Sequence, residues 1–591
     1  MNYKEFKEYN PPALYKGMRQ IKDVYVPMRD GKKLCVDIYL PDRDDRYPAL
    51  LSFSLHNKEL QGSELCDTIP PQPAWSHFWY GNVEAGDTKY LVSRGYAHVI
   101  AQARGNGKSD SGTMFDAEMD HYDIIEWMAQ QEWCDGNIGM LGLSAFAVNQ
   151  LTAASEQPPH LKAIFPYDPG WCYGVFREMH LGGIINMLAY HLEHLSVAHR
   201  SVGQPPKLDE ETEALWQKAM KNPDYMMYAN IYNLLCQKGE YNPFGTLFQD
   251  LLYPYEMEGY MEMAQAKIDK IKIPVYTGSG QYAIDYHFHW QGAQNWFKAL
   301  KNIPKKLQLG GPAHNERPFH SFHNEILKWY DYWLKGIDTG VMDEPPVRYW
   351  VTGENKWRYA SNWPVPETQW TKYYLHSWER LRTDKIDSYA RDGYKEPDAF
   401  VQMSPTMTNE ISLLRYMTEP LAEDTMIAGP ISLNFFAALD SDDTTWIVTL
   451  KDLGPDYSDR TGREGEREQK ELPEKVLTHG YLRASMRELD KELSTPEKPW
   501  HKLTKEAQKM VVPGEINEYN IEIMSVCHMF KSGHRISIEI ACLDLPTGVA
   551  GATNVECIPY HICQNKTVYH KIYRDGKHPS HLLLPIIPIK K

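Results

Sequence analysis

Ser144 is the residue of this chain whose surroundings best suit nucleophilic chemistry. It lies in the segment 137–147, which reads Asn-Ile-Gly-Met-Leu-Gly-Leu-Ser-Ala-Phe-Ala. The apolar run before the serine predicts a buried strand, and residues 148–155 are compatible with a helix. A serine on the sharp turn between a strand and a helix is called a nucleophile elbow. Beside a base, its hydroxyl can attack acyl carbonyls.

The elbow departs from the generic Gly-x-Ser-x-Gly pattern at its second glycine. That position is Phe146, although close packing of the helix on the strand calls for a small residue after the serine. Ala147 supplies a small residue one position later. The alternative interpretation is a Gly-Leu-Ser turn that any α/β sheet could contain.

A catalytic serine needs a histidine as base and a carboxylate that orients the histidine. His314 follows a predicted strand and a Gly-Gly-Pro turn, which is the place of the histidine in α/β-hydrolase order. Asp285 is the only carboxylate on the loop after the predicted strand 273–277, and Asp168 follows the predicted strand 161–165. Both aspartates remain candidates for the acid, and each could instead be an ordinary turn or loop residue.

The predicted oxyanion hole combines two donors. One is the backbone N–H of the residue after the nucleophile, which is Ala145 here. The other comes from the loop 54–58, in which His56 or a nearby backbone N–H could donate. His56 could equally be a surface residue of that loop.

Other polar clusters are weaker signals. The pairs His191/His194 and His287/His289 lack the His-Glu-x-x-His spacing that places two imidazoles on one helix face. The segment 105–109 resembles a phosphate-binding loop, but it lacks the glycine spacing of that motif and is interpreted as a turn after a strand. We therefore expect neither a metal nor another cofactor.

Composition and charge exclude several classes of protein. The net charge of −15 argues against binding of nucleic acid, which needs a basic surface. Nine cysteines without Cys-x-x-Cys pairs indicate reduced thiols. The sequence shows neither a signal peptide nor an apolar run of ~18 residues, so we expect a cytoplasmic protein that does not span a membrane.

The pattern of predicted elements divides the chain into three parts. Residues 1–170 and 270–343 alternate apolar strands with helices, which predicts an α/β core around a mostly parallel sheet. Residues 171–269 show helical spacing and are interpreted as an inserted cap that shapes the substrate pocket. Residues 344–591 show period-two alternation with turn residues, which predicts an all-β sandwich. Its clearest strands are 347–351, 431–435, 446–450 and 536–540.

Six segments, in order along nearly the whole chain, carry a family pattern. They read Met-Arg-Asp-Gly at 28–31, Ala-Arg-Gly-Asn-Gly-Lys-Ser-Asp at 103–110, Trp-Cys-Asp-Gly-Asn-Ile-Gly-Met-Leu-Gly-Leu-Ser at 133–144, Gly-Pro at 311–312, Trp-Tyr-Asp-Tyr-Trp-Leu-Lys-Gly at 329–336 and His-Pro-Ser-His-Leu-Leu-Leu-Pro-Ile at 578–586. Together they resemble the CocE/NonD hydrolases, which are relatives of the X-prolyl dipeptidyl peptidases of the S15 group. The resemblance implies an α/β-hydrolase core, a helical cap and a C-terminal jelly-roll. It also implies a Ser-His-Asp triad that hydrolyses esters or amides, with Ser144 as nucleophile and His314 as base.

Four positions can be compared with the family pattern in more detail. The small residue of the family elbow falls at the third position after the serine, which is Ala147 here. The family tyrosine after the serine is replaced by Ala145, and the early-loop tyrosine that supplies an oxyanion hydroxyl aligns with His56. The family acid aligns with Ala283. Either Asp285 or Asp168 then replaces the acid, or the triad is incomplete.

These observations predict a serine hydrolase that cleaves an acyl ester or amide through an acyl-enzyme on Ser144. Its expected partner is a small-molecule substrate, with neither nucleic acid nor membrane, and contacts between copies through the C-terminal sandwich stay open. One alternative is a catalytically impaired binding protein that keeps the hydrolase fold. The other is an aminopeptidase or amino-acid ester hydrolase, in which Glu178 and Glu193 could supply carboxylates for a substrate amine.

Overall fold

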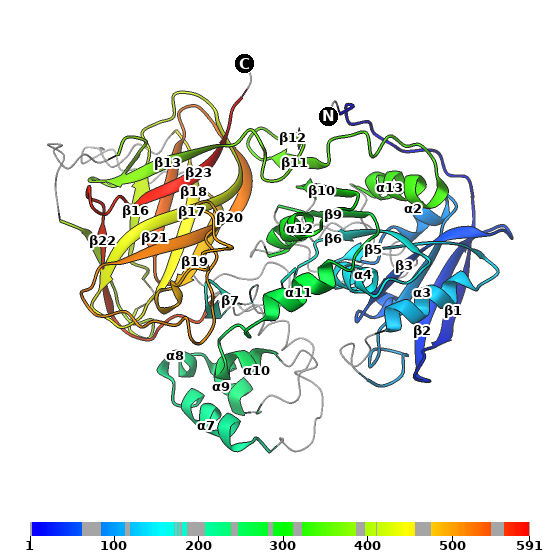
Figure 1. The fold of residues 1–591 in the computed structure, drawn as a ribbon, viewed down its shortest axis with the longest axis horizontal. Coiled ribbons are helices and arrows are strands. Elements are labelled where there is room, and N and C mark those ends of the chain that lie inside the picture. The colour runs from blue at the N-terminus through cyan, green and yellow to red at the C-terminus, as the bar shows by residue number, and fades with distance from the viewer. Residues whose placement is uncertain are drawn as a thin grey trace, which may run out of the picture.

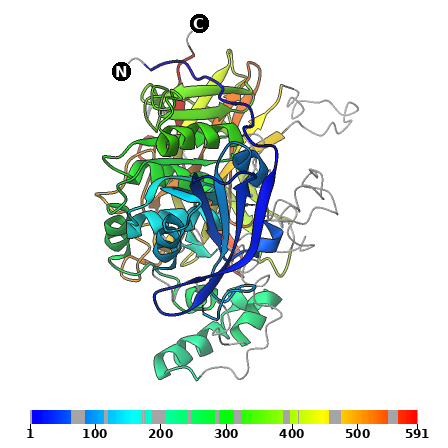
Figure 2. The same ribbon diagram turned by 90° about the vertical axis from the view of Figure 1, so that its right-hand side faces the viewer.

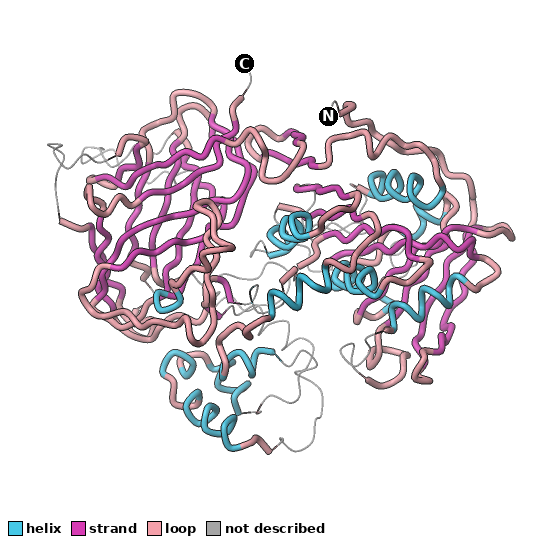
Figure 3. Tube along the Cα trace, in the orientation of Figure 1, coloured by secondary structure: helices cyan, strands magenta, loops and turns pink. Residues whose placement is uncertain are grey.

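The computed structural model describes most of the 591 residues. The described ranges are 3–61, 84–112, 119–170, 172–173, 177, 180–185, 207–236, 238, 246–281, 288–310, 322–385, 396–408, 410–455, 474–544 and 561–589. Two large β units lie side by side, and a group of helices lies below them (Figure 1). Figure 3 shows that helices accompany the strands in the first unit, whereas the C-terminal unit consists almost entirely of strands and loops.

A ten-stranded sheet forms the first unit. Its strands are β1 (Met18–Pro27), β2 (Lys33–Pro41), β3 (Tyr47–Ser54), β4 (Ala97–Gln102), β5 (Cys134–Leu143), β6 (Leu161–Tyr167), β9 (Val275–Ser279), β10 (Lys305–Leu309), β11 (Val347–Val351) and β12 (Lys356–Ala360). Their order across the sheet is β1-β2-β4-β3-β5-β6-β9-β10-β11-β12. The strands from β4 to β11 run parallel, and the strands at both edges are antiparallel. The mostly parallel α/β core predicted from the alternating apolar strands is confirmed.

Helices cover both faces of this sheet. They are α2 (Thr88–Val92), α3 (Asp120–Ala129), α4 (Ala145–Glu156), α12 (Phe288–Ala299) and α13 (His323–Lys335), with a short 3₁₀ helix η1 (Lys58–Leu60) after β3. Apolar residues of α3, α4 and α12 share one buried cluster with the sheet. Residues of α2 and α13 share a second cluster. Both faces of the strands are therefore buried, which is why the strands read as continuous apolar runs.

The chain between β6 and β9 is mainly helical in its described part. Its elements are β7 (His180–Leu181), β8 (Ile184–Ile185), α7 (Glu210–Ala219), α8 (Pro223–Met226), α9 (Ala229–Cys236), α10 (Thr246–Leu252) and α11 (Tyr260–Ile268). The group α7 to α10 stands apart from the sheet in both views (Figures 1 and 2) and has its own apolar cluster. Among the described helices of the chain, none is long and apolar enough to cross a membrane.

An eleven-stranded antiparallel-rich sheet forms the C-terminal unit. Its strands are β13 (Gln369–His376), β14 (Arg380–Arg382), β15 (Asp398–Gln402), β16 (Leu413–Met417), β17 (Thr425–Leu439), β18 (Thr445–Leu453), β19 (Glu474–Arg483), β20 (Asn517–Phe530), β21 (Arg535–Ala541), β22 (Val568–Tyr573) and β23 (His581–Ile587). The sheet closes on itself because β23 pairs with both β13 and β17. The all-β character predicted for this region is confirmed, and three of the four predicted strands lie in β17, β18 and β21.

The fourth predicted strand, 347–351, is assigned to the wrong sheet by its sequence pattern. It is β11, and it pairs in parallel with β10 in the first unit. Its other neighbour is the antiparallel edge strand β12. Period-two alternation indicates that a strand lies near the edge of a sheet, or that one of its faces is less buried than the other. It does not indicate which sheet the strand joins.

The helix α12 is attached to the C-terminal sheet by buried polar contacts. The indole N–H of Trp290 donates to Ser525 Oγ at 3.0 Å, and the Ser525 hydroxyl donates to Gln294 Oε1 at 2.8 Å. The indole N–H of Trp363 donates to the same amide oxygen at 2.8 Å. An apolar cluster that combines α12, β10 and β11 with β17 and β20 surrounds these contacts. The two β units are therefore joined through a common core.

Candidate active site

Ser144 occupies the sharp turn between β5 and α4, as its sequence context predicts. Its backbone has φ 55° and ψ −114°, which is a strained conformation for a residue with a side chain. Its N–H donates to the carbonyl of Tyr167 at 3.1 Å, and its own carbonyl accepts from Val148 at 3.0 Å. Within α4, which is described throughout, no backbone N–H is capped by the Ser144 hydroxyl. The hydroxyl is therefore not used in building its own helix.

The residues around the serine explain the unusual elbow sequence. Gly142 has φ 131°, and a Cβ added there would lie 2.4 Å from the Cβ of Phe146. The same added atom would lie 3.1 Å from the carbonyl oxygen of Glu84, which accepts the N–H of Leu143 at 3.0 Å. Ala147 is fully buried. The large residue thus packs over the glycine before the serine, and the small residue faces the core.

His56 lies beside the elbow. Its Nε2 is 3.3 Å from a carboxylate oxygen of Glu84, whose side chain is 4% exposed. Its ring centroid is 5.8 Å from that of Phe146. Ala145 is the first residue of α4, where backbone N–H groups have no partner inside the helix. The structure therefore places both predicted oxyanion donors next to the turn that carries Ser144.

Asp168 follows β6 and is completely buried. Its backbone lies in the left-handed region with φ 52°, and its N–H donates to the carbonyl of Gly278 at 2.7 Å. Its Oδ1 accepts the N–H of Gly280 at 3.1 Å, so the carboxylate spans the ends of β6 and β9. The residue before it, Tyr167, is the one that binds the N–H of Ser144. Asp168 thus stands at the carboxyl edge of the sheet on the strand adjacent to the elbow.

A histidine that the sequence analysis did not assign to catalysis contacts the serine. His289 Nε2 lies 3.5 Å from Ser144 Oγ, and the side chain is 2% exposed. It belongs to the first turn of α12, and the pattern of the chain singles it out only as half of a weak metal-like pair. One feature of the chain indicates this position. Since α12 is the first helix after β9, its first residues lie near the carboxyl edge of the sheet, where the elbow also lies.

Several predicted residues fall outside the described residues. These are His314, Asp285, Ala283, Glu178, Glu193 and His287. Their roles stay predictions. In the part of the chain that the structure describes, no group of three or more His, Cys, Asp or Glu side chains is arranged to hold a metal ion.

The described residues bring together several kinds of group that acyl transfer uses. A serine hydroxyl on a strained turn contacts an imidazole, a helix N-terminus follows the serine directly, and a buried carboxylate lies on the adjacent strand. Such a constellation can form and break an acyl ester on the serine while backbone N–H groups stabilise the oxyanion.

Comparison with known proteins agrees with this geometry. Residues 30–316 match the model of the X-Pro dipeptidyl-peptidase S15 family, and residues 339–583 match that of the X-Pro dipeptidyl-peptidase C-terminal non-catalytic domain. The cocaine esterase of Rhodococcus sp. is 25% identical over 96% of this chain and 98% of that protein. A CocE/NonD family hydrolase from Staphylococcus aureus has the same fold, with a TM-score of 0.72 at 23% identity over 97% of this chain and 94% of that one. An aminopeptidase from a Thaumarchaeota archaeon also shares the fold, with a TM-score of 0.70 at 18% identity over 100% and 99% of the two chains.

The substitution Gly142→Ala tests the packing of the elbow. The new Cβ would overlap Phe146 and crowd the carbonyl oxygen of Glu84, so the turn that carries Ser144 must move. A displacement of about 1 Å in a reacting group can reduce the reaction rate on the order of 10²-fold. We expect such a loss in the labelling of Ser144 by a fluorophosphonate. Gly136→Ala is the matched control on the same strand, because Gly136 also has a positive φ, of 89°, but its added Cβ meets only His160 at 3.6 Å. Equal loss in both variants would mean that backbone strain, and not the elbow contact, is responsible.

Proposed function

Because the chain belongs to the X-Pro dipeptidyl-peptidase (S15) and CocE/NonD family and is a serine hydrolase, we propose that it cleaves a small acyl ester or amide through an acyl-enzyme on Ser144. The observation that carries this proposal is the strained serine turn with an imidazole 3.5 Å from its hydroxyl. In the first half-reaction Ser144 attacks the acyl carbonyl, a histidine takes the serine proton, and the histidine passes that proton to the alcohol or amine that leaves as its bond to the acyl carbon breaks. In the second, the histidine takes a proton from the water that attacks the ester, and returns it to Ser144 Oγ as the bond between serine and acyl group breaks and the acid is released.

The oxyanion that forms in each half-reaction needs donors. We assign them to the backbone N–H of Ala145 and to the imidazole of His56, which Glu84 orients through its contact with Nε2. In its protonated form, in which both ring nitrogens carry a hydrogen, His56 can contact Glu84 through Nε2 and donate to the oxyanion through Nδ1. Removal of one such donor typically reduces the rate by about 10²–10³-fold.

Two histidines are assigned different roles. His314 has the position of the general base in the family pattern and keeps that role. His289 contacts the Ser144 hydroxyl from α12 and fixes its rotamer in the resting enzyme. In this assignment His289 holds the hydroxyl, and His314 accepts its proton.

Asp168 is the proposed acid. Its burial and its place on the strand next to the elbow support the role, as does its bond to Gly280, which leads into the loop where the family acid is replaced by alanine. In the proposed role its carboxylate accepts a hydrogen bond from the base histidine and stabilises the imidazolium that forms during catalysis. Asp285 is the competing candidate.

The C-terminal sheet is proposed to be a jelly-roll. The match of residues 339–583 to the C-terminal domain model and the closure of the sheet through β17 and β23 support this description. Its contribution to the reaction is indirect, through its attachment to α12.

The first test of this function is the substitution Ser144→Ala with a panel of p-nitrophenyl esters and aminoacyl amides. We expect hydrolysis of the active members to fall by about 10⁴-fold or more, because the nucleophile is lost. A fluorophosphonate should label the wild-type chain stoichiometrically and leave the variant unlabelled. Undiminished hydrolysis in the variant would refute the nucleophile, and an unlabelled wild type would favour a protein that only binds its ligand.

The two histidines are separated by His314→Gln and His289→Gln. Loss of the base should reduce kcat by about 10³–10⁴-fold, whereas loss of a group that only holds the hydroxyl should reduce it by about tenfold. The pH dependence of kcat/KM should lose its lower limb only in the variant that lacks the base. The reverse order of effects would make His289 the base.

The acid is identified by Asp168→Asn and Asp285→Asn. Asparagine keeps the shape of the side chain but stabilises the wrong tautomer of the histidine, which can cost about 10⁴-fold in kcat. We expect this loss for Asp168→Asn and a change of less than about threefold for Asp285→Asn. A large loss confined to the second variant would move the acid to the loop after β9.

A further inference from the structure

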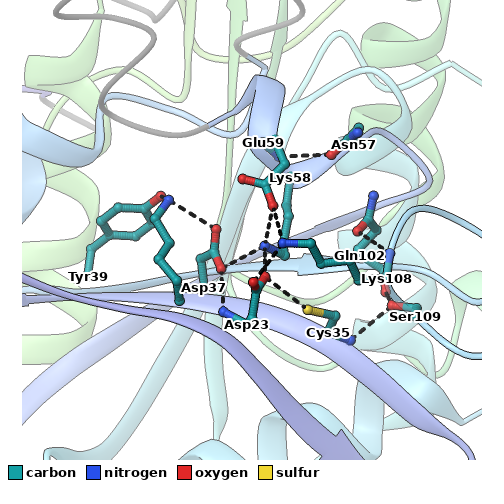
Figure 4. Close-up of polar contacts among 11 residues, drawn as sticks. Asp23, Cys35, Asp37, Tyr39, Asn57, Lys58, Glu59, Gln102, Lys108 and Ser109 are labelled. Carbon is teal, nitrogen blue, oxygen red and sulfur yellow. Dashed lines mark hydrogen bonds and ion pairs between the residues drawn. The ribbon is translucent and has the colours of Figure 1, made fainter.

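Lys58 is a fully buried lysine two residues after His56. Its side chain is 0% exposed, and its ammonium contacts three carboxylates. Asp23 Oδ1 lies at 2.7 Å and Asp37 Oδ1 at 2.8 Å, while Glu59 Oε1 lies at 2.9 Å. Figure 4 shows that these groups come from β1, β2 and η1 and converge on one point.

Two further lysines complete this ion cluster. Lys22 Nζ lies 3.2 Å from Asp37, and Lys108 Nζ lies 2.6 Å from Asp23. Three ammonium groups therefore face three carboxylates. Burial acts to lower the pKa of Lys58, but its bonds to the carboxylates outweigh burial and raise the pKa above its usual range. The surrounding carboxylates therefore favour the charged form of the lysine.

The ion cluster also explains a sequence motif that the function does not use. The segment 105–109, which resembles a phosphate-binding loop, carries Lys108. Ser109 Oγ donates to the Gln102 carbonyl at 2.7 Å and accepts the N–H of Cys35 at 2.9 Å, so the segment is tied to β4 and β2. Lys108 of this segment lies in the ion cluster, and the glycines of the segment form a turn.

Lys58 and Asp37 form a fully buried ion pair at the centre of the cluster, whose other members are partly exposed. Taking an ammonium and a carboxylate out of water carries a large desolvation penalty, and well-packed apolar side chains are often as stable in the same place, so stability alone does not account for the pair. What such a cluster does provide is a defined geometry, because each charge must keep its partners. Lys58 begins η1, and that turn is the element whose geometry the cluster defines.

The turn η1 is connected to the elbow by a short chain of hydrogen bonds. Gln61, directly after η1, donates its N–H to the Lys58 carbonyl at 3.0 Å. Its side-chain oxygen accepts the N–H groups of Glu84 at 2.5 Å and Ala85 at 3.2 Å. Glu84 in turn holds the N–H of Leu143 through its carbonyl, at 3.0 Å, and contacts His56 through its carboxylate, as described above.

We propose that Lys58 is a positioning residue of the hydrolase. Its bonds to the three carboxylates fix η1, and η1 fixes both His56 and the Glu84 contact behind Ser144. The inference rests on the proposed function in one respect, which is the assignment of His56 to the oxyanion hole. Lys58 itself touches neither substrate nor nucleophile.

The substitution Lys58→Met tests this role. A misplaced oxyanion donor should lower kcat by about 10–100-fold, less than outright loss of the donor, and leave KM within about twofold. Lys328→Met is the matched control, because Lys328 is equally buried and paired with Glu344, and the other contacts of its ammonium are the Lys7 carbonyl and the Phe6 ring. We expect the control to lower the melting temperature without changing kcat. A change of kcat below threefold in Lys58→Met would overturn the proposal.

A double variant separates an effect of Lys58 on the position of catalytic groups from an effect on stability. It serves this purpose even when Lys58→Met alone folds poorly. In Asp37→Asn/Lys58→Met the lysine and its most buried carboxylate lose their charges together, so no buried charge of that pair is left uncompensated. We expect the melting temperature to recover toward wild type while kcat stays low. Recovery of kcat together with the melting temperature would show that Lys58 serves stability alone and would overturn the proposal.

A double-mutant cycle with His56→Ala tests the route of the effect. If Lys58 acts through His56, Lys58→Met should change kcat by less than about threefold in the His56→Ala background. A full 10–100-fold additional loss would overturn that route. Failure of the proposed function is distinguishable, since it would appear as full activity in Ser144→Ala, whereas failure of this inference leaves Ser144 essential.

Discussion

The backbone of Ser144 is held in a conformation that a residue with a side chain disfavours, and the site is organised around keeping it there. The carbonyl of Tyr167 on β6 holds its N–H, and the carbonyl of Glu84 holds the N–H of the preceding residue. The side chain of Phe146, on α4, packs over Gly142. A strained turn persists only where its surroundings determine it from several directions. Here a strand, a loop and a helix each supply one contact.

The parallel sheet brings the remaining groups to this turn. His56 follows β3, Ser144 follows β5, Asp168 follows β6 and Gly280 follows β9, so all four stand at the carboxyl ends of neighbouring strands. This is the edge at which open α/β sheets bind their ligands. In the proposed assignment the roles follow the strand order: the nucleophile comes from a central strand, the oxyanion donor from the strand on one side and the carboxylate from the strand on the other.

The sequence predicts those features that depend on local pattern. The sequence predicts the elbow strand, its helix and the C-terminal strands because apolar periodicity is a local property. It assigns residues 347–351 to the wrong sheet because strand pairing is not local. It does not predict the contact of His289 with Ser144 because the direction in which a helix starts depends on tertiary packing. Asp37, between Val36 and Ile38, alternates as an exposed strand residue would, yet it is fully buried because Lys58 reaches it from another loop.

The attachment of α12 to the C-terminal sheet has a consequence for how this protein can change in evolution. Trp290 is anchored on Ser525, and its chain neighbour His289 touches the nucleophile. A gene fusion that exchanged the C-terminal unit would therefore alter the position of His289, which contacts Ser144. The two units differ in architecture but share one core, so a substitution of Ser525 in the C-terminal unit would act on α12 and through it on the contact of His289 with Ser144.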